Sequence, residues 1–344
     1  MSPRPHAQAT RAGAVVGALL LAATTGLAGS WSTPAQAGEV RELGASLCNG
    51  RTPTQTGQPG QSVIGTAGDD VIVTKGAPRV DSGAGNDSIC VTGRGTVVVN
   101  AGPGDDFVGA RAHKGKTFVS LGFGDDTFLG GNGADRVWSQ EASNQNSPDD
   151  QDRIETGGGH DYVISGSSTA PNTDVVSLGP GNDALVTYGF GAGATLLGGL
   201  GRNAFQPLPG PDVSGDWGFD NVTGQATLDS VVRLTWKSFQ RFDLTGLHGS
   251  RTRFFGSRAS ELVVAGGTCR VVLRGRAGDD RLTVDAEGCN SFPAGDARLV
   301  GGPGDDILAG ADGNDVLRGG SGHDEVDGGP GEDLCVAEEV ISCP

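Results

Sequence analysis

The sequence has little of the material from which a conventional hydrophobic core or a familiar catalytic centre is built. Aromatic residues make up 5% of its 344 residues, and Met occurs once. The motifs H-E-x-x-H and G-x-S-x-G are absent, and the five His residues are scattered. No second long apolar run follows the one near the N-terminus. These absences argue against a zinc protease, a nucleophile-elbow hydrolase and a pore-forming toxin.

Positive charge is also scarce, whereas glycine is abundant. The chain has 61 Gly and a formal net charge of −16. Without the first 37 residues, which contain two Arg and no acid, 23 Lys and Arg stand against 41 Asp and Glu, a balance of −18. A surface of this charge repels nucleic acids and anionic membranes, although it also serves general solubility.

An apolar run near the N-terminus predicts export. Two Arg precede an apolar stretch over residues 12–27, and Ala35-Gln36-Ala37 offers a small-residue cleavage site. This is the pattern of a secretory signal peptide. A retained membrane anchor is the alternative, but the run contains Gly and Thr and is short for a membrane span. We therefore expect a secreted, extracellular protein whose mature chain begins at Gly38.

Four consecutive nonapeptides at residues 301–336 carry the clearest pattern. Each approximates G-G-x-G-x-D-x-U-x, where U is apolar. Gly-rich turns let backbone carbonyls crowd together, and a carboxylate at the sixth place adds charge, which suits the oxygen-only coordination of Ca²⁺. The predicted ligand residues are Asp306, Asp315, Asp324 and Asp333, with the turn glycines Gly302, Gly304, Gly313, Gly320, Gly322 and Gly331.

The eighth place of each unit predicts how the units associate. It holds Leu308, Leu317, Val326 and Cys335. A turn of six residues and a strand of three bury little alone, so successive units are expected to coil into a solenoid around a shared narrow core. Two units form one coil of about 18 residues. The predicted fold class is all-β.

These units resemble the RTX, or hemolysin-type, calcium-binding repeats of secreted bacterial proteins. The resemblance implies a right-handed parallel β-roll, a β-solenoid in which each Ca²⁺ lies between two turns stacked one coil apart. It pairs the turn of Asp306 with that of Asp324, and the turn of Asp315 with that of Asp333. Ala311 departs from the pattern because it replaces the second Gly of its unit.

Single copies of the motif recur upstream. The first four sixth-place Asp residues are 17, 19 and 20 residues apart, close to one coil, which predicts calcium-type turns on one edge only. A tandem unit at 130–138 follows, then a polar loop at 139–152, after which the ladder resumes with two units. Asn203 stands in place of Asp in a later unit, where no ion is expected, and Arg276 replaces the second Gly of a lone unit. The predicted ligands are Asp70, Asp87, Asp106, Asp126, Asp135, Asp161, Asp183 and Asp280.

The alternative explanation of an isolated unit is that Gly and Asp simply form turns between short strands. A fixed Asp in four in-phase units is not explained in that way. Crowded carboxylates, much Gly and little apolar burial predict that folding of at least the C-terminal units depends on Ca²⁺. The expected affinity is that of extracellular modules, about 10⁻⁴ to 10⁻³ M.

Six Cys suit an oxidising compartment and permit fifteen pairings. Two of them lie 20 residues apart, about one coil, and stacked strands lie about 4.8 Å apart, within disulfide range. Two others flank the last unit, so that bridges would staple the ends of the solenoid. The resulting pairing is Cys269 with Cys289, Cys335 with Cys343, and Cys48 with Cys90.

Between Phe205 and Phe255 the repeat fades, and eight of the chain's eighteen aromatic residues occur there. Alternation around residues 231–244 predicts strands, so the roll either widens into a non-metal stretch or is interrupted by a separate β unit. The rings form either an ordinary core, which we favour, or a sugar-binding face.

The predicted organisation has six parts: a signal peptide at 1–37, an N-terminal cap at 38–64, a first β-roll block at 65–206, a divergent aromatic-containing segment at 207–274, a second block at 275–336 and a C-terminal cap at 337–344. The predicted function is calcium binding by a non-catalytic structural or adhesive protein of the extracellular space or envelope. The alternatives are a Ca²⁺-dependent polysaccharide-binding protein and a polysaccharide-acting enzyme. Calcium is the only expected cofactor, and neither nucleic-acid binding nor membrane insertion is expected.

Overall fold

The computed structural model describes residues 47–140, 150–191, 193–210, 213–285 and 296–344. Within these ranges the chain forms strands and no helix, which confirms the all-β class. Residues 45–344 make up one compact unit. The predicted signal peptide, the start of the predicted N-terminal cap and most of the predicted loop at 139–152 lie outside the described residues.

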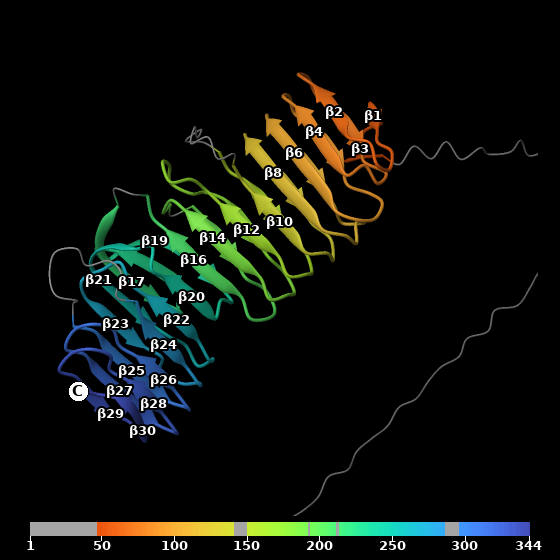
Figure 1. Ribbon diagram of the computed structural model, residues 1–344. Coiled ribbons are helices and arrows are strands. Elements are labelled where there is room, and N and C mark those ends of the chain that lie inside the picture. The colour runs from red at the N-terminus through yellow and green to blue at the C-terminus, as the bar shows by residue number, and fades with distance from the viewer. Residues whose placement is uncertain (1–46, 141–149, 192, 211–212, 286–295) are drawn as a thin grey trace, which may run out of the picture. The chain divides into compact units, whose positions relative to one another are not determined.

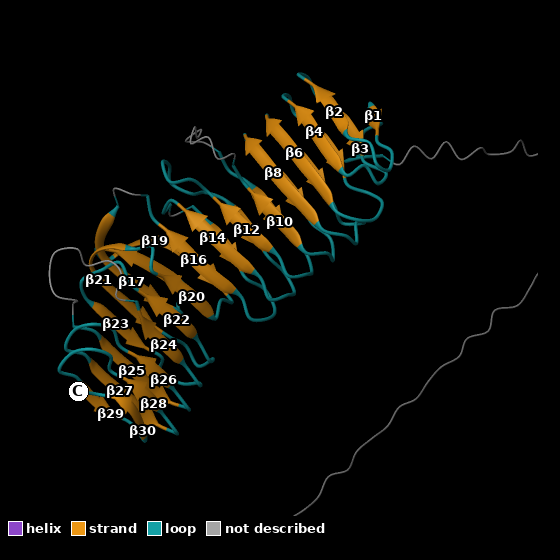
Figure 2. Ribbon diagram, viewed as in Figure 1, coloured by secondary structure: helices purple, strands orange, loops and turns teal. Residues whose placement is uncertain are grey.

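Two stacked sheets run along the molecule, and successive coils add a strand to each (Figures 1 and 2). The wide sheet has 16 strands in the order β1 (Gln55–Thr56), β3 (Val71–Val73), β5 (Ser88–Cys90), β7 (Phe107–Gly109), β9 (Thr127–Leu129), β11 (Arg153–Glu155), β13 (Val175–Ser177), β15 (Thr195–Leu197), β19 (Val231–Lys237), β18 (Gln225–Leu228), β17 (Ser214–Asp220), β21 (His248–Phe255), β23 (Val271–Arg274), β25 (Arg298–Pro303), β27 (Val316–Ser321) and β29 (Leu334–Val336). The narrow sheet has 14 strands in the order β2 (Val63–Thr66), β4 (Arg79–Gly83), β6 (Val97–Pro103), β8 (Thr117–Phe123), β10 (Asp135–Trp138), β12 (Tyr162–Ser165), β14 (Ala184–Tyr188), β16 (Ala204–Leu208), β20 (Arg241–Leu244), β22 (Leu262–Ala265), β24 (Arg281–Val284), β26 (Ile307–Ala309), β28 (Glu325–Asp327) and β30 (Glu339–Ser342).

The register of the strands places the eighth residue of each nonapeptide in the core, as predicted. Leu308 pairs with Val326 across β26 and β28, and Leu317 pairs with Cys335 across β27 and β29. The first three of these side chains are buried, and Cys335 packs partly buried against the same core. Each buried aliphatic side chain contributes about 1.5–3 kcal/mol, and a single unit supplies only one. The core therefore exists only through stacking, which is the reason for a solenoid.

The coil pattern is interrupted between β16 and β20. In the narrow sheet these two strands are direct neighbours, but in the wide sheet β17 and β18 are inserted, pairing antiparallel with each other and with β19. The wide sheet thereby gains the two strands by which it outnumbers the narrow one. Of the two predicted alternatives for this segment, the structure has the widened roll.

Aromatic residues fill the extra width. Trp236 packs with Phe219 of the inserted strands and with Phe205 and Phe242 of the narrow sheet, with ring centroids 5.5–5.9 Å apart, and Trp217 packs with Phe190 at 5.0 Å. The five side chains other than Phe190 are at most 3% exposed. The interpretation of this segment as ordinary core is confirmed for them. For these five rings the alternative of an aromatic sugar-binding face is wrong, because they point inward, whereas Phe255 of the same segment is only partly buried.

Two predicted disulfides are present at the ends of the solenoid. Cys48 is bonded to Cys90, which ties the segment before β1 onto β5, and Cys335 is bonded to Cys343. Cys269 is also disulfide-bonded, and its predicted partner, Cys289, lies outside the described residues. In the described ranges no helix is long and apolar enough to cross a membrane.

The bridge at the N-terminal end is expected to stabilise the fold more than the bridge at the C-terminal end. Cys48 and Cys90 are separated by 42 residues, and Cys335 and Cys343 by 8. Loop-closure entropy then gives losses of about 4 and about 2.5 kcal/mol for the two Cys-to-Ala double variants. Urea unfolding in saturating Ca²⁺ measures these losses. A larger loss for the C-terminal pair would contradict the entropic argument.

Candidate metal centre

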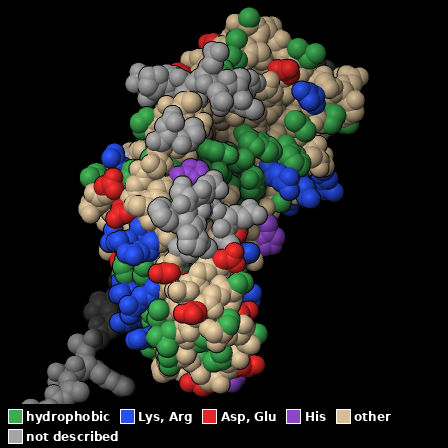
Figure 3. Space-filling model, turned by 60° about the vertical axis from the view of Figure 1, so that its left-hand side comes forward, with side chains coloured by type: hydrophobic (Ala, Val, Ile, Leu, Met, Phe, Trp, Pro, Cys, Tyr) green, Lys and Arg blue, Asp and Glu red, His purple; other side chains and the backbone are tan. Residues whose placement is uncertain are grey.

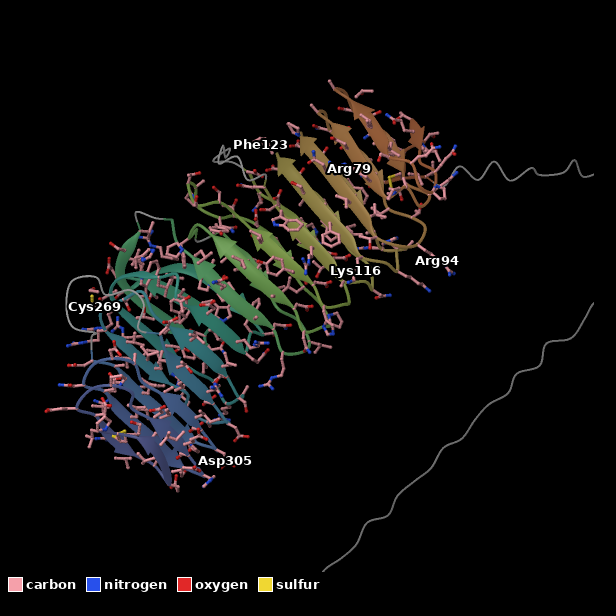
Figure 4. The ribbon with its side chains drawn as sticks, viewed as in Figure 1. Arg79, Arg94, Lys116, Phe123, Cys269 and Asp305 are labelled. Carbon is pink, nitrogen blue, oxygen red and sulfur yellow. A yellow bond between two sulfur atoms is a disulfide. The ribbon has the colours of Figure 1, made fainter. Side chains whose placement is uncertain are left out.

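Calcium-type turns lie on both edges of the solenoid. We call the edge where the chain passes from the narrow to the wide sheet the first edge, and the opposite one the second edge. Figure 4 shows Phe123, in a first-edge turn, on the opposite side from Arg94 and Lys116, which belong to plain turns of the second edge. Asp305 lies on the second edge in the C-terminal coils. The N-terminal coils therefore have their calcium-type turns on one edge, as predicted from the spacing.

A ladder of buried carboxylates runs along the first edge. The backbone N–H of each sixth-place Asp donates to Oδ1 of the Asp one coil further on, at 2.7–3.0 Å. Asp315 and Asp333 continue the same arrangement in the C-terminal coils, at 2.8 Å. The members of the first stretch are Asp70, Asp87, Asp106, Asp126, Asp152 and Asp174.

A second ladder follows the opposite edge. It begins with Asp135, Asp161 and Asp183 and continues through the amides of Asn203 and Gln240. After the inserted strands it is formed by Glu261, Asp280, Asp306, Asp324 and Glu338, with N–H to oxygen distances of 2.8–3.1 Å. The tandem unit at 130–138 moves the motif by half a coil. Asp161 and Asp183 consequently continue from Asp135 and lie on the edge opposite to Asp126.

Residues at the fifth place form a further ladder on each edge, which runs in the reverse direction. Here the later coil donates: the N–H of Asp125 bonds to Oδ1 of Asp105 at 3.1 Å, and the N–H of His323 bonds to Oδ1 of Asp305 at 2.9 Å. Two successive backbone N–H groups of a turn therefore donate in opposite directions along the solenoid axis. The fifth-place N–H donates to the preceding coil and the sixth-place N–H to the following coil. Fifth-place carboxylates are exposed to solvent, whereas their sixth-place neighbours are buried.

The remaining oxygen of most sixth-place carboxylates has no partner. Oδ2 is buried without a hydrogen bond from any described residue in nine of the twelve predicted Asp ligands, namely Asp87, Asp106, Asp126, Asp161, Asp183, Asp280, Asp306, Asp324 and Asp333. In the other three, Oδ2 accepts a backbone N–H from Thr66, Gly131 or Ala311. A buried carboxylate oxygen without a donor is costly unless a cation neutralises it.

Four of these orphaned oxygens, those of Asp280, Asp306, Asp324 and Asp333, lie beside a glycine at the first place of their unit and point at the space that its missing Cβ leaves open. A Cβ built on Gly301 would lie 2.1 Å from Oδ2 of Asp306, and one on Gly319 would lie 2.3 Å from Oδ2 of Asp324. On Gly275 it would meet Oδ2 of Asp280 at 2.0 Å and the carbonyl of Gly301 at 2.9 Å. Two acceptor oxygens thus face one small space without a proton between them. A hard cation with oxygen ligands fits this arrangement.

Asn203 shows how the same turn is completed without charge. Its Oδ1 accepts the N–H of Asp183, as an Asp would, but its Nδ2 donates to the carbonyl of Ser238 at 3.1 Å. The amide N–H thus satisfies a carbonyl that faces the side chain, in a unit where no ion is predicted. Where Asp occupies the place, that donor is missing.

Burial raises the pKa of the ladder carboxyls, and neighbouring carboxylates raise it further. The pKa is raised to about 8 at Asp106, about 9 at Asp126, about 8 at Asp280 and about 6 at Asp306, although each accepts a backbone hydrogen bond that lowers it. At Asp70 burial is outweighed by hydrogen bonds from Thr66, Thr54 and Gln55, and the pKa is lowered. Without a cation, the inner coils therefore hold protons near neutral pH.

In chelator, the protein is expected to be more stable at pH 5 than at pH 8. The folded pKa of Asp106 is about 8, above its ordinary value of 3.8, so the folded state binds more protons than the unfolded state between these values. Stability then falls as pH rises. At pH 5 in chelator we expect a folded protein with a measurable thermal midpoint, and at pH 8 little or no β signal, both measured by circular dichroism. Saturating Ca²⁺ should reverse the order, since protons compete with the metal. A midpoint that rises with pH in chelator would contradict these protonation states.

Four acidic ladder members were not predicted as ligands, namely Asp152, Asp174, Glu261 and Glu338, the last of which accepts the N–H of Asp324. Asp152, at the end of the predicted loop, and Asp174 are buried links of the first edge, and Glu261 stands at a sixth place on the second edge. Their turns lack the paired glycines of the motif. The sequence feature that could have identified the first three of them is an acidic residue two positions before a buried apolar residue, as in Asp152 before Ile154 and Asp174 before Val176.

The twelve predicted Asp residues are not gathered into one centre. In the described ranges, no group of three or more His, Cys, Asp or Glu side chains is placed to hold one metal ion. Each turn instead contributes one inward carboxylate and its carbonyl oxygens. The six predicted turn glycines all have φ between 128° and 154°, a region that side chains rarely adopt. Arg276 takes φ 79° at a second-Gly place.

Fold and turns together define a calcium-binding parallel β-solenoid. Residues 118–143 and 300–335 match the family of RTX calcium-binding nonapeptide repeats, in four copies, and the chain thus carries RTX repeats that indicate Ca²⁺ binding. No curated protein matches the chain.

Proposed function

We propose that this protein is a secreted, non-catalytic β-roll that folds on Ca²⁺ and serves a structural or adhesive role in the extracellular space or cell envelope. The nine buried Oδ2 atoms without a donor carry the proposal, because a cation completes each of them. Millimolar calcium outside the cell suits sites of extracellular affinity. The N-terminal apolar run and the disulfides at the ends of the solenoid support secretion.

Export and adhesion can be tested with the full chain. Expressed in a secreting bacterial host, it should appear in the medium with Gly38 as its first residue by mass spectrometry. The purified protein should sediment with isolated cell envelopes in Ca²⁺ and be released by chelator. Retention inside the cell would contradict secretion, and binding that is indifferent to chelator would contradict a calcium-dependent adhesive role.

A Ca²⁺-dependent polysaccharide-binding protein is the second candidate, favoured by a hollow on the outer face of the narrow sheet. The buried aromatic residues of β16–β21 lend it no support. The third candidate, a polysaccharide-acting enzyme, predicts release of reducing ends from polysaccharides incubated with the calcium-loaded protein. We expect none.

A further inference from the structure

The outer face of the narrow sheet has a hollow at the level of the inserted strands. It has a volume of about 480 Å³ and is lined by five successive strands, β12, β14, β16, β20 and β22. Its size is that of a small-molecule site. The wide sheet has two extra strands here, β17 and β18, so along the solenoid axis it is longer than the narrow sheet by two strand spacings, roughly 10 Å.

Small side chains open the hollow between two large ones. Strand pairing aligns Tyr162, Ala184, Ala204 and Arg241 in one row across β12, β14, β16 and β20. The ends of this row are three strand spacings apart, roughly 14 Å, which is the length of a short oligosaccharide. The alanines thus form the floor, and the aromatic ring and the guanidinium form the two ends.

A fixed polar group lies beside this row. Asp243 accepts hydrogen bonds from Nε2 of Gln206 at 2.9 Å, from Oγ1 of Thr245 at 2.7 Å and from the N–H of Thr245 at 3.1 Å. Its carboxylate is therefore held in one orientation at the wall of the hollow. Val186 and Val264 supply apolar surface next to it. Orienting polar groups on an otherwise apolar lining are typical of ligand sites.

One guanidinium, that of Arg241, and two carboxylates, those of Asp243 and Asp285, line the hollow. Arg241 is exposed and forms no ion pair with any described residue. Arg136 and Arg281 stand in the same row, which has no acid from β8 to β24, whereas Asp243 and Asp285 line the hollow off that row. Figure 3 shows Lys and Arg side chains toward both margins of the face in view, around its middle height. The net charge of the chain thus does not describe this row of side chains.

We propose that the hollow binds an acidic polysaccharide, with a uronate carboxylate on Arg241 and a sugar ring packed on Tyr162. The inference rests on the proposed adhesive function and names its ligand class and site. A ligand that packs on the ring of Tyr162 and pairs a carboxylate with the guanidinium of Arg241 must have both a flat face and a negative charge. Asp243 and Gln206 then take sugar hydroxyls. The buried aromatic core has no part in this site.

The test is calorimetric titration of the calcium-saturated full chain with a uronate tetrasaccharide, which is long enough to reach from Tyr162 to Arg241. Arg241→Gln should weaken binding at least about tenfold, since the variant loses a charge-assisted pair. Ala204→Leu should weaken it similarly by filling the floor. Arg79→Gln is the matched control, because Arg79 lies in the same row on β4, four strand spacings from Tyr162 (Figure 4). It should change affinity less than about twofold.

Three outcomes would overturn the site. These are no binding by the folded wild-type chain, equal weakening by Arg241→Gln and Arg79→Gln, and tighter binding of an oligonucleotide of equal charge. Equal affinity for the tetrasaccharide with reduced carboxyls would overturn the anionic part of the ligand class. Calcium-dependent sedimentation with envelopes that survives Arg241→Gln would leave the proposed function standing while the hollow fails. Loss of that sedimentation in the wild type would count against the proposed function itself.

Discussion

Gly320→Ala is expected to unfold the C-terminal coils. Gly320 has φ 135°, and a Cβ there would lie 1.9 Å from the carbonyl oxygen of Gly302, one coil away. Neither backbone can move without breaking the pairing of β25 with β27, in which these two glycines are partners. Backbone strain and the overlap together should cost more than about 4 kcal/mol. Urea unfolding in saturating Ca²⁺ measures the loss.

Gly68→Ala is the control for this variant. Gly68 also lies in a calcium-type turn, but a Cβ on it meets nothing within 4 Å. We expect a change within about 0.5 kcal/mol. A loss below about 1 kcal/mol for Gly320→Ala would mean that the coils are not stacked as closely as described.

Asp306→Asn is expected to remove a calcium site and yet not to weaken the chelated protein. The amide Oδ1 can still accept the N–H of Asp280, which donates to Asp306 at 2.8 Å, while Nδ2 replaces the orphaned Oδ2. Asn203 already has this arrangement. With one ligand charge lost, the Ca²⁺ midpoint of folding should rise at least about tenfold. In chelator at pH 5, where protons take the place of the metal, the thermal midpoint should stay equal or rise.

Asp305→Asn makes the same change of charge one residue away. Asp305 is exposed, and its Oδ1 accepts the N–H of His323 at 2.9 Å, which an amide oxygen also does. Its Ca²⁺ midpoint should shift less than about threefold, since exposed charges interact weakly. Equal shifts for the two variants would show that net charge, and not the buried carboxylate, governs the response.

The sequence predicted the parts of this fold that repeat locally. A fixed nine-residue phase places Leu308 over Val326 and the turn of Asp306 over that of Asp324, and the structure has both. The edge of Asp161 was harder to assign, because it depends on the half-coil step introduced by the tandem unit at 130–138. Asp152 and Asp174 could not be recognised, since their turns use residues other than the paired glycines.

Features made by distant neighbours could not be predicted. Hydrophobic alternation indicated strands near residues 231–244, but it does not say that β17 and β18 enter only one sheet. The hollow arises because Ala184 and Ala204 become neighbours between Tyr162 and Arg241, residues up to 79 positions apart. Nothing in the local sequence around any of these residues marks it as part of a surface site.

The central claim is that calcium completes the buried carboxylate ladders and thereby folds the chain. It is tested most directly by circular dichroism of the oxidised mature protein at pH 8 during a Ca²⁺ titration, with chelator reversal and a Mg²⁺ control. We predict a cooperative gain of β signal with a midpoint of about 10⁻⁴ to 10⁻³ M, lost in chelator and not produced by Mg²⁺. A β signal that is complete in chelator and unchanged by Ca²⁺ would contradict the claim.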